Sequence, residues 1–211
     1  MVDEEAVYGL GCPENLRRLQ LVRASLDNVV LRNAGNAIMH LYKKEPLADE
    51  VVVLGEGSAQ RAYGIGKVST AERSDLYLCL KLYRYRPYDP RNKNDELLEQ
   101  VAGFNEASIA YGRAEKLGGD FLPNILYFFG LVSWGDGNYG IITEDISHAK
   151  EFELMELGRV EFATRNRDGE REIFFIDPIR LRHRRVSEQV LDEYLLPEHV
   201  LRIPDEYVSQ V

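Results

Sequence analysis

The sequence has few cysteines and too little positive charge for several classes of protein. Its 211 residues include two cysteines, Cys12 and Cys79. Two cysteines make no disulfide framework, and their spacing does not match a C-x-x-C metal motif. The formal net charge is −9, whereas a general nucleic-acid binder presents a basic surface to the phosphate backbone. We therefore expect no structural disulfide and no nucleic-acid partner.

Long hydrophobic runs are also absent. No stretch approaches the ~18 apolar residues that a membrane-spanning helix requires. The chain begins Met-Val-Asp-Glu-Glu, whereas a secretory signal begins with basic residues followed by an apolar segment. The expectation is a cytoplasmic protein with no membrane partner.

Hydrophobic residues nevertheless make up 45% of the chain, which is enough for a sizeable core. Residues 13–44 predict amphipathic helices, because apolar residues recur there at helical spacing. The stretch 33–36 is expected to interrupt or kink this helical segment, and Pro46 is expected to end it.

Beyond Pro46 the pattern changes to short runs rich in β-branched and aromatic residues. The predicted elements are strands at 51–54, 62–68 and 76–83, a long helix at 95–117, strands at 125–133 and 139–143, a hairpin of 160–164 with 172–176, and a short helix at 187–196 before an irregular tail. Strands followed by a helix and then by more antiparallel strands predict the α+β class.

A glycine-containing turn carries the first functional signal. Gly55 and Gly57 end one predicted strand, Ser58 follows them, and a second strand begins soon after. Because glycine has no Cβ atom, such a turn lets backbone N–H groups approach a triphosphate. The alternative is an ordinary hairpin turn. A dinucleotide-binding fingerprint is not indicated, since it requires a helix after the glycines.

Lys81 is the second signal, because it is the one cation in the apolar strand 76–83. Burying an ammonium group is costly unless it is paired, so this lysine is either a strand-edge side chain that reaches water or a phosphate ligand. A pairing carboxylate is expected from the helix at 95–117. Glu106 is the first choice and Glu99 is the alternative, although either could belong to a solvated helix face.

Together these segments resemble the small lobe of protein kinases. That family has a glycine loop followed by a strand of the Val-Ala-Ile-Lys type, and here residues 78–81 (Leu-Cys-Leu-Lys) follow the glycine turn. Residues 121–126 look like the segment before the family's fourth strand. Residues 139–146 look like its fifth strand and hinge. The pattern is also similar to short bacterial kinase-like proteins of the YrbL type.

The resemblance implies a fold and a set of boundaries. The α+β fold would contain a kinase-like small lobe, made of an antiparallel sheet and one long helix, at 49–146. A helical extension would precede it at 1–48. A truncated C-terminal segment with a minimal hairpin and helix would follow at 147–211.

The resemblance also implies an ATP site with Mg²⁺. Thr143 would be the gatekeeper beside the adenine, and the backbone of Glu144 to Ile146 would hold the base. Glu106 would pair with the phosphate lysine, and Asp177 would bind the metal as the family's Asp-Phe-Gly aspartate does. The residues implied to bind the nucleotide are Gly55, Gly57, Ser58, Lys81, Thr143, Glu144 and Ile146. The candidate catalytic residues are Lys81, Glu106 and Asp177.

Departures from the family pattern weaken the expectation of catalysis. Gln60 replaces the third glycine of the loop, and residues 147–172 contain no His-Arg-Asp segment. Pro178 and Ile179 replace the Phe and Gly that follow the metal-binding aspartate, and an Asp before Pro is also an ordinary turn starter.

Three functions therefore remain open. The first is an ATP-binding protein that is a minimal or atypical phosphotransferase. The second is a pseudokinase-like regulatory module that binds a protein partner without catalysis. The third is an unrelated α+β binding domain in which the glycine turn is only a hairpin. The basic stretch 180–185 would meet phosphates or acidic substrates in the first reading, and otherwise forms a solvated face.

Overall fold

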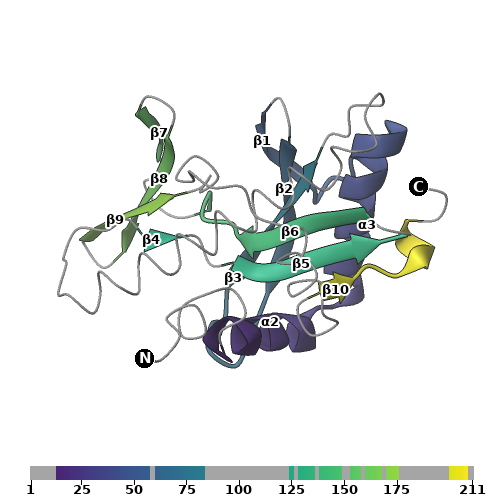
Figure 1. Cartoon of the computed structure of the whole chain (residues 1–211), viewed down its shortest axis with the longest axis horizontal. Coiled ribbons are helices and arrows are strands. Elements are labelled where there is room, and N and C mark those ends of the chain that lie inside the picture. The colour runs from purple at the N-terminus through teal and green to yellow at the C-terminus, as the bar shows by residue number, and fades with distance from the viewer. Residues whose placement is uncertain are drawn as a thin grey trace, which may run out of the picture.

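The computed structural model describes residues 13–57, 60–83, 124–125, 128–135, 138–148, 153–157, 160–167, 170–175 and 200–208. Two helices, α2 (Pro13–Ser25) and α3 (Asn28–Lys43), precede the strands. The strands form two separate sheets, which lie side by side in Figure 1. The chain therefore belongs to the α+β class. The predicted helices at 95–117 and 187–196 lie outside the described residues.

The first sheet has six strands in the order β1-β2-β3-β6-β5-β10. Neighbouring strands run antiparallel from β1 to β5, and β10 pairs with β5 in the parallel direction. The strands are β1 (Val52–Glu56), β2 (Gln60–Val68), β3 (Leu76–Tyr83), β5 (Phe128–Trp134), β6 (Asn138–Glu144) and β10 (Val200–Arg202). The strands predicted at 51–54, 62–68, 76–83 and 139–143 are confirmed with small shifts at their ends. The single strand predicted at 125–133 is divided, because Asn124–Ile125 pairs in the second sheet and β5 begins at Phe128.

The second sheet has the order β4-β9-β8-β7. Its strands are β4 (Asn124–Ile125), β7 (Glu153–Leu157), β8 (Val160–Arg167) and β9 (Glu170–Phe175). The hairpin expected from 160–164 and 172–176 is the antiparallel pair of β8 and β9. Strand β7 was not predicted.

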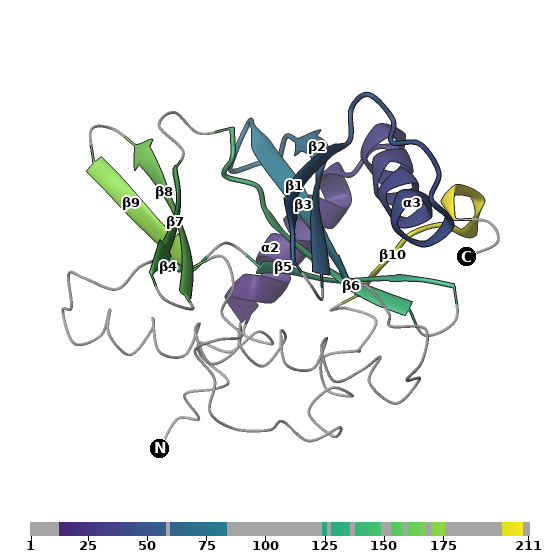
Figure 2. The ribbon, with the colours of Figure 1, turned by 90° about the horizontal axis from the view of Figure 1, so that it is seen from above.

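The core of the protein lies between the two helices and one face of the first sheet. Alternate residues of β3 point towards the helices, because side chains alternate between the two faces of a strand. The buried cluster contains side chains from α2, α3 and the sheet, including Leu19, Ile38, Tyr63, Leu78, Leu80 and Trp134. Figure 2 shows α3 alongside β2, on the side away from the second sheet. We call the face of the first sheet that packs against α2 and α3 the helix-side face.

The helix break is not where the sequence suggested. The predicted interruption at 33–36 is wrong, since α2 ends at Ser25 and α3 begins at Asn28. Asp27 caps α3, because its Oδ1 accepts hydrogen bonds from the N–H groups of Val29 and Val30 at 2.9 Å.

Two asparagines at 33–36 make contacts from α3 to other segments of the chain. Asn33 is buried and its Nδ2 donates to Ile65 O of β2 at 3.0 Å. The side chain of Asn36 donates to Pro46 O at 3.1 Å and accepts from Ala48 N at 2.8 Å. These contacts hold the helix and the following loop against the sheet, which offsets the weak helix propensity of asparagine.

The C-terminal tail returns to the first sheet. Instead of the irregular tail that was expected, residues 200–202 form β10, and Ile203 N donates to Ser133 O at 2.9 Å. A 3₁₀ turn, η3 (Asp205–Tyr207), then packs on α3. The proposed division at 1–48, 49–146 and 147–211 stays a prediction, but the hydrophobic core includes side chains from all three parts.

Gly35 is required where α3 meets η3. A Cβ atom at Gly35 would lie 2.5 Å from Tyr207 O. We expect Gly35→Ala to lower the free energy of unfolding by about 1–3 kcal/mol, although alanine favours a helix intrinsically. Urea unfolding measures this change. Gly55→Ala is the matched control, because a Cβ at Gly55 meets nothing within 4 Å. A Gly35→Ala variant as stable as the wild type would contradict the close packing.

Candidate functional site

Lys81 lies in a row of residues that crosses the first sheet. Gly55 of β1 pairs with Ala62 of β2, Ala62 pairs with Lys81 of β3, and Lys81 pairs with Ile141 of β6. Paired residues project to the same face, and neighbouring strands are about 4.8 Å apart. Because Leu80 and Leu82 belong to the core cluster, Lys81 projects to the opposite face of the sheet. We call this opposite surface the lysine-side face.

The lysine is buried rather than a side chain that reaches water at a strand edge. Only 6% of its surface is exposed, and β3 is an inner strand between β2 and β6. A cation in such a place interacts strongly with an anion, because the effective dielectric constant is lower than in water.

Thr143 lies on the same face, next to the lysine. It pairs with Cys79, which is two residues before Lys81 on β3. Thr143 is fully buried and Cys79 is 5% exposed. Gly64 of β2 pairs with Cys79 from the other side. The structure thus brings Gly55, Lys81 and Thr143 of the predicted site together on one face.

The thiol of Cys79 is held protonated by this environment. Burial raises its pKa from 9.0 to about 11, and the nearby charge of Lys81 opposes that rise. The unfolded thiol ionises at lower pH than the folded one. The stability contributed by the buried neutral thiol is therefore complete below pH 9 and is lost as the pH rises towards 11.

We expect Cys79 to be inert in the folded protein. In a Cys12→Ser variant, alkylation by iodoacetamide at pH 8 should be at least about 100-fold slower in buffer than in urea, because the thiolate is the reactive form. Mass spectrometry measures the rate. Equal rates in the folded and unfolded chains would place the thiol at the surface.

The glycine turn is closed by its own backbone. Gly57 N donates to Gln60 O at 2.9 Å, so this N–H group is used within the turn. Glu56 and Arg61 form an ion pair across the same hairpin at 2.5 Å. Ser58 lies outside the described residues.

The end of β6 and the residue after it are held by contacts with β3 and with the loop between β2 and β3. Glu144 is 2% exposed and forms an ion pair with Arg73 Nη2 at 2.8 Å. Asp145 N donates to Tyr77 O at 2.8 Å. Of the three residues whose backbone was expected to hold adenine, Asp145 therefore has its N–H group already engaged. Ile146 is buried.

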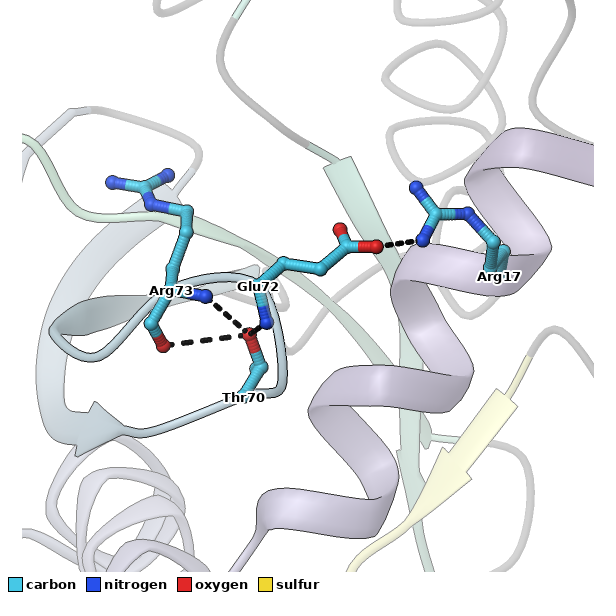
Figure 3. A network of polar contacts seen from close by, with 4 residues as sticks. All are labelled: Arg17, Thr70, Glu72 and Arg73. Carbon is cyan, nitrogen blue, oxygen red and sulfur yellow. Dashed lines mark hydrogen bonds and ion pairs between the residues drawn. The ribbon is translucent and has the colours of Figure 1, made fainter.

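The loop between β2 and β3 positions Arg73 for this contact. Thr70 Oγ1 accepts hydrogen bonds from Glu72 N at 3.3 Å and Arg73 N at 3.1 Å, as Figure 3 shows. Glu72 forms an ion pair with Arg17 of α2. The loop thus connects α2 to the end of β6. The predicted site did not include Arg73, because its partner is distant in sequence.

Asp145 and His148 form a polar cluster at the end of the lysine-side face. The Asp145 side chain is 3% exposed, and its Oδ1 accepts from Ser147 N at 2.8 Å. Its Oδ2 lies 3.3 Å from Nε2 of His148. The His148 ring stacks on Tyr77 with ring centroids 4.0 Å apart. The only sequence signal for this cluster was the pair of acidic residues, Glu144 and Asp145, that follows the strand predicted at 139–143.

Two of the candidate catalytic residues, Glu106 and Asp177, lie outside the described residues. Asp177 is also the predicted Mg²⁺ ligand. Among the residues that the structure describes, no group of three or more His, Cys, Asp or Glu side chains could hold a metal ion. In the same part of the chain, no helix is long and apolar enough to cross a membrane. No family model, curated protein or solved structure matches this chain.

Proposed function

We propose that this chain is a kinase-like nucleotide-binding protein that holds ATP with Mg²⁺ on its lysine-side face. The observation that carries the proposal is the row formed by Gly55, Ala62 and Lys81, which aligns a glycine turn with a buried cation. Thr143 lies beside this row on the same face.

The arrangement of the matched segments supports this proposal. The glycine turn, the lysine strand and the strand ending at Glu144 are neighbours in one antiparallel sheet. In the kinase-like arrangement the glycine loop joins the first two strands and the lysine binds the phosphates from the third strand. The phosphates of ATP would lie near Gly55 and Lys81, and the base would lie nearer to Thr143.

The Mg²⁺ ion and the lysine's carboxylate partner rest on the resemblance. Asp177 would hold the metal and Glu106 would pair with the lysine. Phosphoryl transfer would require, in addition, a group that orients the nucleophile. We therefore propose nucleotide binding as the function and an atypical phosphotransferase activity as its extension.

Thermal unfolding of the full chain with and without ATP–Mg²⁺ tests the proposal. At an ATP concentration of about 100 times Kd, binding adds about 2.7 kcal/mol, which for a chain of this length raises Tm by roughly 5–10 °C. Mg²⁺ alone is the control. An unchanged Tm at every ATP concentration would contradict nucleotide binding.

A second candidate is a pseudokinase-like module that binds a protein partner. The observation in its favour is β1, an edge strand of the first sheet with Val52 and Val53 exposed by 54% and 37%. Edge strands with exposed apolar residues can pair with another chain. Under this reading, mutation of Lys81 leaves partner binding intact.

A further inference from the structure

We propose that Asp145 selects the base of the bound nucleotide, because its buried carboxylate accepts a hydrogen bond from the 6-amino group of adenine. The inference rests on the proposed nucleotide site. It adds the side chain that distinguishes a 6-aminopurine from a 6-oxopurine.

The carboxylate lies on the lysine-side face of the sheet. A Cβ atom placed on Gly64 would be 3.4 Å from Asp145 Oδ2 and 3.5 Å from the side chain of Leu54. Gly64 pairs with Cys79, and Cys79 pairs with Thr143. Oδ2 is therefore close to the strands of the glycine hairpin and to the gatekeeper, where the base would lie in the proposed site.

One oxygen of this carboxylate lacks a hydrogen bond. Oδ1 accepts from Ser147 N, whereas Oδ2 is buried and accepts no hydrogen bond from any residue in the described part of the chain. His148 Nε2 is 3.3 Å away but is not aligned as a donor. A buried acceptor that receives no hydrogen bond is unfavourable, and an ionised carboxylate can only accept. The position is therefore suited to a ligand that supplies an N–H group.

The backbone next to this oxygen offers no compensating donor. Asp145 N already donates to Tyr77 O at 2.8 Å. The 6-amino group of adenine would satisfy Oδ2, whereas in a base held in the same orientation the 6-carbonyl oxygen of hypoxanthine or guanine would face another acceptor. Sites built to hydrogen-bond one group discriminate strongly against an analogue that lacks it. The carboxylate therefore favours ATP over the 6-oxo nucleotides.

Calorimetric titration of the full chain with ATP–Mg²⁺ and with ITP–Mg²⁺ tests this inference, because the two ligands differ only in the 6-substituent of the purine and in the proton that the 6-oxo form carries on N1. We expect the wild type to bind ITP about 10- to 100-fold more weakly than ATP. In Asp145→Asn the amide can both donate and accept, so the two affinities should agree within about threefold.

Asp75→Asn is the matched control. It removes the same charge from a side chain that is 59% exposed and bound to Lys67, and it should keep the wild-type preference for ATP. The Oδ1 contact with Ser147 N can persist in Asp145→Asn, and the Tm of the variant reports whether the fold is kept.

The possible outcomes separate the two proposals. Equal wild-type affinities for ATP and ITP, or an unchanged ratio in Asp145→Asn, would overturn base selection by Asp145 while leaving nucleotide binding intact. ATP binding that appears only in Asp145→Asn would show that the carboxylate blocks the site, which also overturns the inference. No binding of either nucleotide to any variant would overturn both proposals.

Discussion

A chain that begins at Val51, and so lacks α2 and α3, is expected not to fold. The two helices cover the helix-side face, where large apolar side chains such as Tyr63, Ile65 and Leu80 are at most 1% exposed. Exposing five such side chains would cost roughly 8–15 kcal/mol, which equals the whole stability of a typical domain of about 5–15 kcal/mol.

Trp134 provides a direct readout of this effect. It is the sole tryptophan of the sequence, it is fully buried, and its ring lies 5.8 Å from that of Tyr42 in α3. We expect the fluorescence of the truncated chain to shift to the wavelength of exposed tryptophan, with no cooperative urea transition. A chain that lacks only residues 1–12 keeps both helices and is the control. A truncated chain that retained wild-type stability would mean that the helices are not part of the core.

Much of the first sheet could be predicted because its signals are local. β-branched and apolar runs bounded by glycine and proline indicated β1, β2, β3, β5 and β6. The sequence left open whether Lys81 reaches water or is buried, and the structure shows that it is buried. Strand β10 could not be predicted, because three residues at the C-terminus pair with β5 from far along the chain. The prediction that residues 33–36 interrupt the helix was wrong for a similar reason.

The asparagines and the glycine at 33–36 normally favour a break in a helix. In this fold Asn33 bonds to the backbone of β2, and Gly35 accommodates Tyr207. The role proposed for Asp145 was equally hidden in the sequence, because it depends on the register that places Gly64 opposite Cys79. The unbroken helix and the position of Asp145 both depend on contacts between distant segments, and no local sequence pattern indicates such contacts.

Replacement of Lys81 by methionine is expected to weaken ATP–Mg²⁺ binding by about 10- to 100-fold. A charge-assisted hydrogen bond contributes about 1.5–3 kcal/mol, and each 1.4 kcal/mol is a factor of about ten in affinity. Methionine keeps the apolar stem within the strand and removes only the cation. The loss should therefore appear in the affinity for the nucleotide, with the fold retained.

Lys67→Met is the matched control. Lys67 lies on β2 of the same sheet, but its side chain is 56% exposed and forms an ion pair with Asp75 Oδ1 at 2.7 Å. The same change of charge at this position should leave ATP binding within about twofold of the wild type, since exposed ion pairs contribute little.

Calorimetric titration of ATP–Mg²⁺ into the wild type, Lys81→Met and Lys67→Met tests the central claim most directly. The claim predicts one nucleotide site per chain. It also predicts that affinity falls by about 10- to 100-fold in Lys81→Met and stays near the wild-type value in Lys67→Met. Equal affinities in all three proteins would place the nucleotide away from the lysine-side face. The absence of binding to the wild type would contradict a nucleotide site altogether.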